Sequence, residues 1–169
     1  MQAFLEEAKR SSRTIANLST AVKNKVLNEM ADALMNHCDF IISHNEKDMM
    51  DARVNNLSES LQDRLLLTGQ RVKDMADAIR QIASQLEPVG RILDGWVTKD
   101  GLNIQKVSIP IGVIGIIYES RPNVTSDTAA LCFKSGNVCV LKGGKEAEHS
   151  NKAIAIVLKE VLAKNKLPE

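Results

Sequence analysis

A polar segment follows directly on an apolar run in the second half of the chain. The run Val113–Tyr118 reads VIGIIY, and the residues after it are Glu119, Ser120, Arg121, Pro122 and Asn123. A guanidinium can bind a phosphate or a carboxylate through two parallel hydrogen bonds, and serine and asparagine side chains can add more. We therefore predict an active-site or cofactor loop made of Tyr118 and these five residues. A second interpretation stays open, in which Arg121 pairs with Glu119 and Asn123 caps a helix.

A second polar segment follows the next apolar run, Val138–Leu141. It holds two lysines and two glycines: Lys142, Gly143, Gly144 and Lys145. The lysines supply positive charge, and glycine, which has no Cβ, lets a ligand approach the backbone closely. The segment is neither a Walker motif nor GxGxxG, so taken alone it is also typical of a loop with solvated lysines.

Alternating strands and helices would bring these two segments together. Gly112–Tyr118 and Val138–Leu141 are continuous apolar runs, as expected of strands covered on both faces. Val124–Ser135, stopped by Gly136, and the amphipathic Glu146–Lys164 are expected helices. This order predicts a parallel, doubly wound sheet. Ligands of such sheets lie beyond the carboxyl ends of the strands, next to helix N-termini that favour anions.

The preceding part of the chain is predicted to be helical and to carry no chemistry. A first helix is predicted from an apolar stripe over 22–34 after a Ser19 cap, and a second helix is expected to start at Phe40. A Ser60-x-x-Asp63 capping pattern predicts a short helix that ends near Leu67. An apolar stripe over 72–86, closed by Pro88, predicts a fourth helix.

Two strand-like runs follow, on either side of Lys99-Asp100-Gly101. Asp-Gly is a strong hairpin signal. Because a two-stranded hairpin is marginal in water, we expect this one to add to another sheet or to another subunit.

Composition limits the function classes. The 169 residues are 44% hydrophobic and 25% charged, with a net charge of +1, which argues against broad binding of nucleic acid or membrane. There is no signal-peptide core, and the longest apolar run is too short to cross a bilayer. Cys38, Cys132 and Cys139 form no CxxC pair, and the histidines have no metal-ligand spacing. We expect a cytoplasmic protein with reduced thiols and no metal.

The chain ends at Glu169, where a turn would lead into a third parallel strand. Two strands and two helices make half of a nucleotide-binding sheet. We therefore expect the sequence to be truncated, with a bare sheet edge.

Longer motifs show a resemblance to a known family. Pro110–Ala147 resembles the start of the cofactor domain in the aldehyde dehydrogenase superfamily, which has a Pro-x-Gly-Val strand and then a Gly-Asn-x-Val-x-x-Lys strand. Gly136-Asn137-Val138 and Lys142 reproduce the second element. Within the superfamily, Tyr118–Thr125 and Lys142–Glu146 are similar to the gamma-glutamyl phosphate reductases, and the helical N-terminal part is similar to them as well. The likeness covers nearly all of the chain.

The resemblance implies an α/β fold in three parts, which together make a truncated aldehyde dehydrogenase fold. Residues 1–90 would be the helical N-terminal region of the cofactor domain. Residues 91–109 would be a β-hairpin of the oligomerisation sheet, so that the protein forms a homo-oligomer. Residues 110–169 would be the first half of a doubly wound parallel Rossmann-like sheet that binds NADP.

It also implies a reaction. NADPH would reduce L-glutamyl 5-phosphate, a small acyl phosphate, to L-glutamate 5-semialdehyde with release of phosphate, the second step of proline biosynthesis. A cysteine thiolate would attack the acyl phosphate, and the resulting thioester would accept hydride. Channelling from glutamate 5-kinase is expected as well.

Family roles transfer to only some positions. Lys142 corresponds to a lysine that contacts the adenosine ribose, with Gly143 and Gly144 beside it in the cofactor-binding loop. Lys145 lies near the place of a ribose-binding carboxylate in NAD-preferring relatives, and a lysine there suits the 2′-phosphate of NADPH. Asn123 lies four residues beyond the family's oxyanion-binding asparagine, so we give it only a place in the loop.

No catalytic residue is assigned within the chain. The family's nucleophilic cysteine is expected beyond Glu169. A catalytic thiolate needs an exposed, electropositive setting, whereas Cys132 and Cys139 are expected in the core. The chain alone is therefore expected to be inactive. Two alternatives stay open: a non-catalytic interaction or nucleotide-binding module, and a dehydrogenase of the same superfamily that acts on another aldehyde.

Overall fold

The computed structural model describes residues 2–169. The chain forms helices and strands in the order α1 (Gln2–Ala16), α2 (Thr20–Asn36), α3 (Cys38–Val54), α4 (Glu59–Leu65), α5 (Gly69–Ser84), β1 (Ile92–Val97), β2 (Asn103–Val107), β3 (Val113–Ile117), α6 (Asn123–Lys134), β4 (Val138–Lys142), the 3-10 turn η1 (Lys145–Ala147) and α7 (Glu148–Lys164). Within these residues, no helix combines the length and apolar character needed to cross a bilayer.

Local signals explain most helix boundaries. The predicted cap at Ser19 is confirmed, because its hydroxyl accepts a hydrogen bond from the Val22 amide at 3.3 Å. The capping pattern at Ser60 was wrong: the N-cap is Ser58, so α4 begins at Glu59, two residues earlier than a cap at Ser60 implies. The stripe that was expected to run to Leu86 ends with α5 at Ser84, and the Leu86 side chain is 82% exposed.

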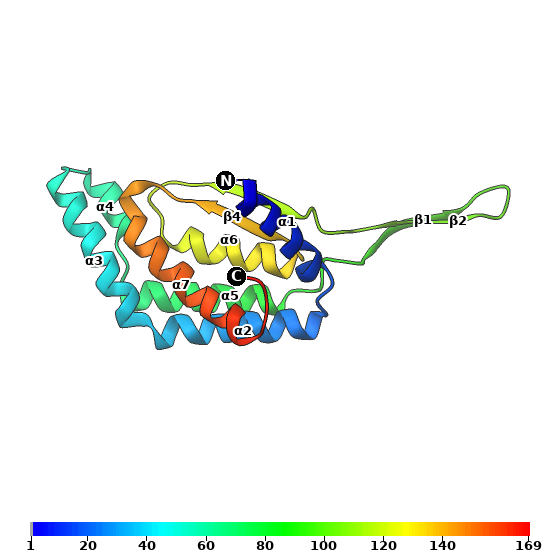
Figure 1. The fold of residues 1–169 in the computed structure, drawn as a ribbon, viewed down its shortest axis with the longest axis horizontal. Coiled ribbons are helices and arrows are strands. Elements are labelled where there is room, and N and C mark those ends of the chain that lie inside the picture. The colour runs from blue at the N-terminus through cyan, green and yellow to red at the C-terminus, as the bar shows by residue number, and fades with distance from the viewer. Residues whose placement is uncertain (1) are drawn as a thin grey trace.

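One hydrophobic core joins the helical half to the strand-containing half. Most of its buried side chains come from α2 and α5, and α6 and α7 supply others; they include Leu27, Ile79, Phe133 and Ile154. In Figure 1, α2 and α5 run side by side below α6 and α7. α2 and α5 therefore support α6 and α7 by packing against them.

β3 and β4 form the predicted parallel pair, with Val113 opposite Val138 and Ile117 opposite Lys142. The expectation that both strands are covered on both faces was wrong, because Ile117 is 82% exposed and β3 is at most half-buried along its length. The physical reason is that the described sheet has only these two strands, and β4 takes most of the contacts with α1 and α6. β3 is the less covered strand.

The Gly136-Asn137 pair links α6 to both strands. Gly136 has φ +73°, and the Gly136 and Asn137 amides donate to the carbonyls of Phe133 and Cys132 at 3.1 and 2.8 Å. This is a Schellman ending of α6. The Asn137 side chain then accepts a hydrogen bond from the Gly112 amide at 2.8 Å, just before β3. One motif thus ends the helix, begins β4 and sets the start of β3.

The predicted hairpin is confirmed. β1 and β2 pair antiparallel around Lys99-Asp100-Gly101, and Gly101 adopts φ +84°, as a three-residue turn with a left-handed last residue requires. Figure 1 shows the hairpin extending away from the helices. It carries exposed apolar side chains, including Leu93, Trp96 and Val97.

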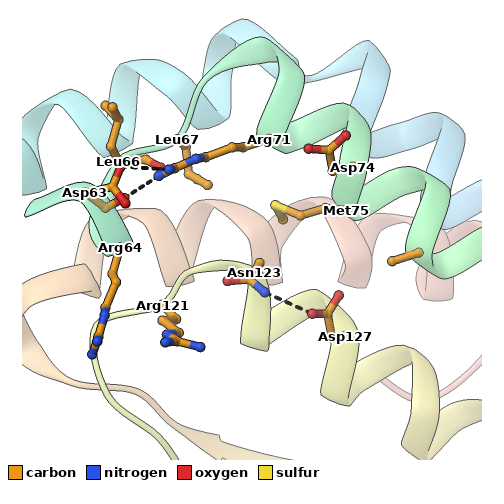
Figure 2. Close-up of a pocket in the computed structure, with 11 residues that line it drawn as sticks. Asp63, Arg64, Leu66, Leu67, Arg71, Asp74, Met75, Arg121, Asn123 and Asp127 are labelled. Carbon is orange, nitrogen blue, oxygen red and sulfur yellow. Dashed lines mark hydrogen bonds and ion pairs between the residues drawn. The ribbon is translucent and has the colours of Figure 1, made fainter. Parts of the chain in front are cut away.

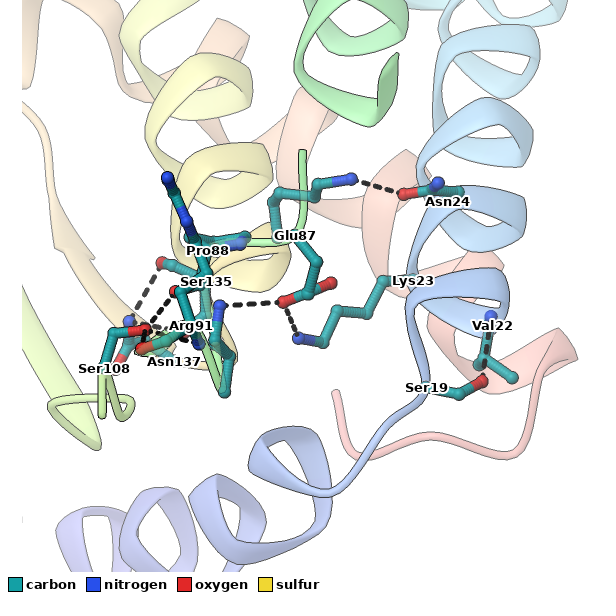
Figure 3. Close-up of polar contacts among 12 residues, drawn as sticks. Ser19, Val22, Lys23, Asn24, Glu87, Pro88, Arg91, Ser108, Ser135 and Asn137 are labelled. Atoms are coloured by element: carbon teal, nitrogen blue, oxygen red, sulfur yellow. Dashed lines mark hydrogen bonds and ion pairs between the residues drawn. The ribbon is translucent and has the colours of Figure 1, made fainter. Parts of the chain in front are cut away.

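A partly buried ion pair holds the base of the hairpin (Figure 3). Lys23 on α2 is 1% exposed and lies 2.8 Å from Glu87, which also accepts a hydrogen bond from the Val89 amide at 3.2 Å. Ser108 then closes the base, because its hydroxyl donates to the Pro88 carbonyl at 2.6 Å. The hairpin is therefore anchored to the helical core at its root.

The fold predicts a specific sensitivity at Gly136. A Cβ there would lie 2.9 Å from Pro110 Cγ, and a left-handed backbone costs an ordinary residue about 1–2 kcal/mol. We expect Gly136→Ala to lower the free energy of unfolding by at least that amount in denaturant titration. Gly115→Ala in β3 is the matched control, because a Cβ there meets nothing within 4 Å. Equal stability of the two variants would contradict this account of the α6–β4 connection.

Candidate functional site

The two polar loops lie at the same end of the sheet, as predicted. β3 and β4 are parallel and end opposite one another, at Ile117 and Lys142. The Tyr118 amide continues the pairing by donating to the Lys142 carbonyl at 3.1 Å. The segments 118–123 and 142–145 therefore leave the sheet as neighbours and run into α6 and α7.

A chain of hydrogen bonds fixes the first loop to both helices. Tyr118 Oη lies 2.6 Å from Thr125 Oγ1, and Thr125 donates to Asn151 Oδ1 at 2.9 Å. Because Thr125 has one hydroxyl proton, Tyr118 is the donor to Thr125. Burial raises the pKa of Tyr118, which keeps the phenol protonated. Sequence reasoning missed Asn151, since it lies in an ordinary polar stretch with no spacing signal.

The glycines of the second loop have an internal role. A Cβ on Gly143 would overlap the Asn151 amide and press on the Tyr118 ring, and one on Gly144 would meet the Glu146 carboxylate. Neither glycine has a left-handed backbone. Their small size thus allows the two loops to pack on each other.

The two lysines of this loop keep their charges available. Lys142 and Lys145 are both exposed, and within residues 2–169 neither takes part in an ion pair. Two unneutralised ammonium groups beside the end of β4 suit an anionic ligand such as a phosphate. In this respect the loop fits the phosphate-bearing part of a nucleotide cofactor.

The alternative interpretation of the first loop was wrong. α6 begins after Pro122 without a side-chain cap, and the Asn123 side chain instead donates to Asp127 Oδ2 at 3.0 Å. Among the described residues no ion pair joins Arg121 to Glu119; these residues share only a backbone hydrogen bond of 2.6 Å. Arg121 is exposed, and its guanidinium is free to bind a ligand.

Arg121 lies in a cleft of about 410 Å³ between α4, α5 and the start of α6 (Figure 2). The cleft is lined by six charged side chains, one amide and four apolar side chains: Asp63, Arg64, Arg71, Asp74, Arg121 and Asp127, then Asn123, then Leu66, Leu67, Met75 and Ala78. Sequence analysis assigned no chemistry to the α4–α5 segment. Arg64 and Arg71 sit in a polar stretch without a motif, and only the packing of α5 against α6 brings them to Arg121.

Part of this charge is already neutralised inside the cleft. Arg71 lies 2.8 Å from the Asp63 carboxylate and donates to the Leu66 carbonyl at 2.8 Å, which holds the α4–α5 turn. Asp74 accepts a hydrogen bond from the Gln70 side chain at 2.8 Å. Within residues 2–169, the guanidiniums of Arg64 and Arg121 form neither an ion pair nor a side-chain hydrogen bond.

Asp127 is the most unusual carboxylate in the cleft. Oδ2 accepts the Asn123 hydrogen bond, but Oδ1 is buried and has no hydrogen-bond partner. Burial raises the pKa of Asp127, and the hydrogen bond from Asn123 offsets this only in part. An incompletely compensated carboxylate beside a cleft is a feature typical of binding sites.

The cysteines lie away from the cleft. Cys132 is 5% exposed, as expected of a core residue, whereas Cys139 is partly exposed rather than buried. A hydrogen bond with Cys132, together with burial, raises the pKa of Cys139, and the same hydrogen bond lowers the pKa of Cys132. Burial raises the pKa of Cys38. Across residues 2–169, no cluster of three His, Cys, Asp or Glu side chains could hold a metal ion.

Comparison with known proteins identifies relatives of this chain. No family model matches the chain. The gamma-glutamyl phosphate reductase of Aliarcobacter butzleri strain RM4018 is 79% identical over 169 residues, which are 100% of this chain and 41% of that protein. The reductase of Sulfurovum sp. strain NBC37-1 is 66% identical over the same coverage. The homologues of this chain are gamma-glutamyl phosphate reductases.

Solved structures agree with the sequence comparison. The crystal structure of gamma-glutamyl phosphate reductase from Thermotoga maritima superposes with a TM-score of 0.93 at 40% identity, over 96% of this chain and 39% of that one. An acetylating aldehyde dehydrogenase from Geobacillus thermoglucosidasius superposes with a TM-score of 0.68 at 16% identity, over 99% of this chain and 34% of that one. The fold is therefore part of the aldehyde dehydrogenase fold. The chain spans about two fifths of the length of the curated reductases that it matches.

The environment of Asp127 leads to a prediction about stability. The pKa of Asp127 is raised in the folded protein, so the folded state binds the proton more tightly than the unfolded state does. Protonated Asp127 therefore favours folding fully below the unfolded pKa of 3.8, and this stabilisation is lost as the pH rises through the folded pKa. Asparagine does not titrate. We therefore expect Asp127→Asn to unfold at a higher temperature than the parent protein at pH 7, with a gain that shrinks as the pH falls toward 3.8.

Asp51→Asn, at an exposed position on α3, is the control and should show no such pH-dependent gain. If thermal unfolding of Asp127→Asn matched that of the parent at every pH, the carboxylate would be better compensated than its contacts indicate.

Proposed function

We propose that the protein containing this chain is a gamma-glutamyl phosphate reductase, which uses NADPH to convert L-glutamyl 5-phosphate to L-glutamate 5-semialdehyde and phosphate. The observation that carries the proposal is the 79% identity to a curated reductase along all 169 residues. The TM-score of 0.93 to a solved reductase supports it. An enzyme of proline biosynthesis with free thiols is expected to work in the cytoplasm.

Within this chain, we assign cofactor binding to the loop after β4. Lys142 would contact the adenosine ribose and Lys145 the 2′-phosphate, with Gly143 and Gly144 letting the loop pack against Tyr118. The exposure and free charge of both lysines support this assignment. When bound, the cofactor supplies the hydride.

The loop 118–123 would bind and orient the substrate. Arg121, which extends into the charged cleft, provides a guanidinium for an anionic group of the substrate, and the Tyr118–Thr125–Asn151 hydrogen bonds hold the loop in place. The nucleophilic cysteine is assigned to residues outside this chain, because Cys132 is buried and none of the three cysteines lines the cleft.

We further propose that the hairpin 91–109 pairs with a second copy of the protein. It projects from the body with exposed apolar side chains, and an isolated hairpin of this kind is marginal in water. Delivery of the acyl phosphate from glutamate 5-kinase stays a prediction from the family resemblance.

The activity can be tested directly on the full-length product of the reading frame that encodes this sequence. We expect it to oxidise L-glutamate 5-semialdehyde with NADP and inorganic phosphate, and to show no comparable turnover when phosphate is omitted. NADPH formation is the readout. A protein that oxidises simple aldehydes equally well without phosphate would be a different dehydrogenase of this fold.

Cofactor preference gives a second test. Lys145→Ala removes the cation assigned to the 2′-phosphate, so we expect KM for NADPH to rise about tenfold, as for the loss of one charge-assisted hydrogen bond, while KM for NADH changes by less than about twofold. Lys159→Ala, at an exposed position on α7, is the control. An equal effect of Lys145→Ala on both cofactors would remove the 2′-phosphate assignment.

A further inference from the structure

The cleft between α4, α5 and α6 is lined by three arginines and three aspartates, and none of these residues belongs to the cofactor loop 142–145. Of its three arginines, only Arg71 is paired, with Asp63. Arg64 and Arg121 remain as available cations, and Asp127 remains as a carboxylate with one unpartnered oxygen. A ligand that neutralises this set needs an anionic group and a cationic group close together.

In Figure 2 the charges that take part in no ion pair lie apart from one another. Arg64 from α4 and Arg121 from the loop before α6 lie at one side of the cleft, while Asp127 lies on α6 beyond Asn123. A carboxylate suits the guanidinium side through paired hydrogen bonds. A primary ammonium suits the Asp127 side, where it would compensate a carboxylate that the protein leaves incompletely hydrogen-bonded.

A phosphate group fits this cleft less well. The lining contains three aspartates, Asp63, Asp74 and Asp127, and a dianion would be repelled by those that are not neutralised. The apolar side chains of Leu67, Met75 and Ala78 instead suit the methylene groups of a short aliphatic chain.

We propose that this cleft binds the α-amino acid head group of the substrate, with the α-carboxylate on Arg121 and Arg64 and the α-ammonium on Asp127. This inference rests on the proposed function, since it names the part of an amino-acid substrate that the cleft takes. Arg121 belongs both to the cleft and to the loop that follows β3. A head group held there directs the other end of the substrate toward the ends of β3 and β4, where the cofactor loop lies.

Binding of three probes to the full-length protein tests the proposal without turnover. Calorimetry with L-glutamate, with glutarate, which lacks the ammonium group, and with inorganic phosphate should give the tightest binding for L-glutamate. Arg121→Gln should weaken L-glutamate and glutarate alike, by about tenfold or more. Asp127→Asn should weaken L-glutamate by a similar factor, leave glutarate within about twofold and so abolish the preference for the amine.

Arg53→Gln is the matched control, at an exposed arginine on α3 outside the cleft, and should leave all three dissociation constants unchanged. The proposal is overturned if the parent protein binds glutarate as tightly as L-glutamate, if phosphate alone competes for Arg121, or if none of the probes binds.

Turnover separates this inference from the proposed function. If the enzyme is an active reductase but Arg121→Gln and Asp127→Asn raise KM for L-glutamate 5-semialdehyde no more than Arg53→Gln does, the head group binds elsewhere and the reductase assignment stands. If L-glutamate binds as predicted but the protein does not act on the semialdehyde, the cleft assignment stands and the reaction is a different one.

Discussion

The parallel pairing of β3 with β4 is the interaction on which the site depends. Its register sets Ile117 opposite Lys142, so both strands end at the same level and release their loops side by side. A displacement of one strand by a single residue would turn its side chains to the opposite face and separate Tyr118 from the Thr125–Asn151 hydrogen bonds. The register is protected at the other end of the strands, where Asn137 binds the Gly112 amide.

The helical half of the chain contributes directly to the site as well as supporting it. α5 packs against α6 through the common core, and this contact places the α4–α5 turn opposite the start of α6. The turn is itself rigid, because Asn45 on α3 accepts the Leu67 amide and donates to the Leu65 carbonyl, each at 2.8 Å. Asp48 on the same helix accepts the Ser150 amide at 2.7 Å and so fixes the start of α7. Two buried polar residues of α3 therefore hold two boundaries of the site at once.

Sequence reasoning found the elements and the two loops but not the cleft. The helices and the hairpin were predictable because caps, apolar stripes and Asp-Gly are signals of local structure. The error at Ser60 arose because Ser60, with Asp63 three residues later, fits the capping-box spacing, whereas the actual N-cap Ser58 has Leu61 at that place. The burial of β3 was overestimated because an apolar run indicates a strand but does not show how many helices or strands of the same chain pack against it. Arg64 and Arg71 could not be recognised, since their proximity to Arg121 arises from the packing of α5 on α6, which no local pattern encodes.

The ion pair of the buried Lys23 with Glu87 has a consequence for the geometry of assembly. The hairpin leaves the body from a point fixed by a lysine that is almost completely enclosed in the helical core. The direction of the hairpin therefore depends on α2, which carries Lys23, and on the segment after α5, which carries Glu87. In an oligomer formed through these hairpins, the angle between two copies would therefore depend on contacts inside each monomer. Substitutions at Lys23 would then change the direction of the hairpin, and with it the relative orientation of the copies.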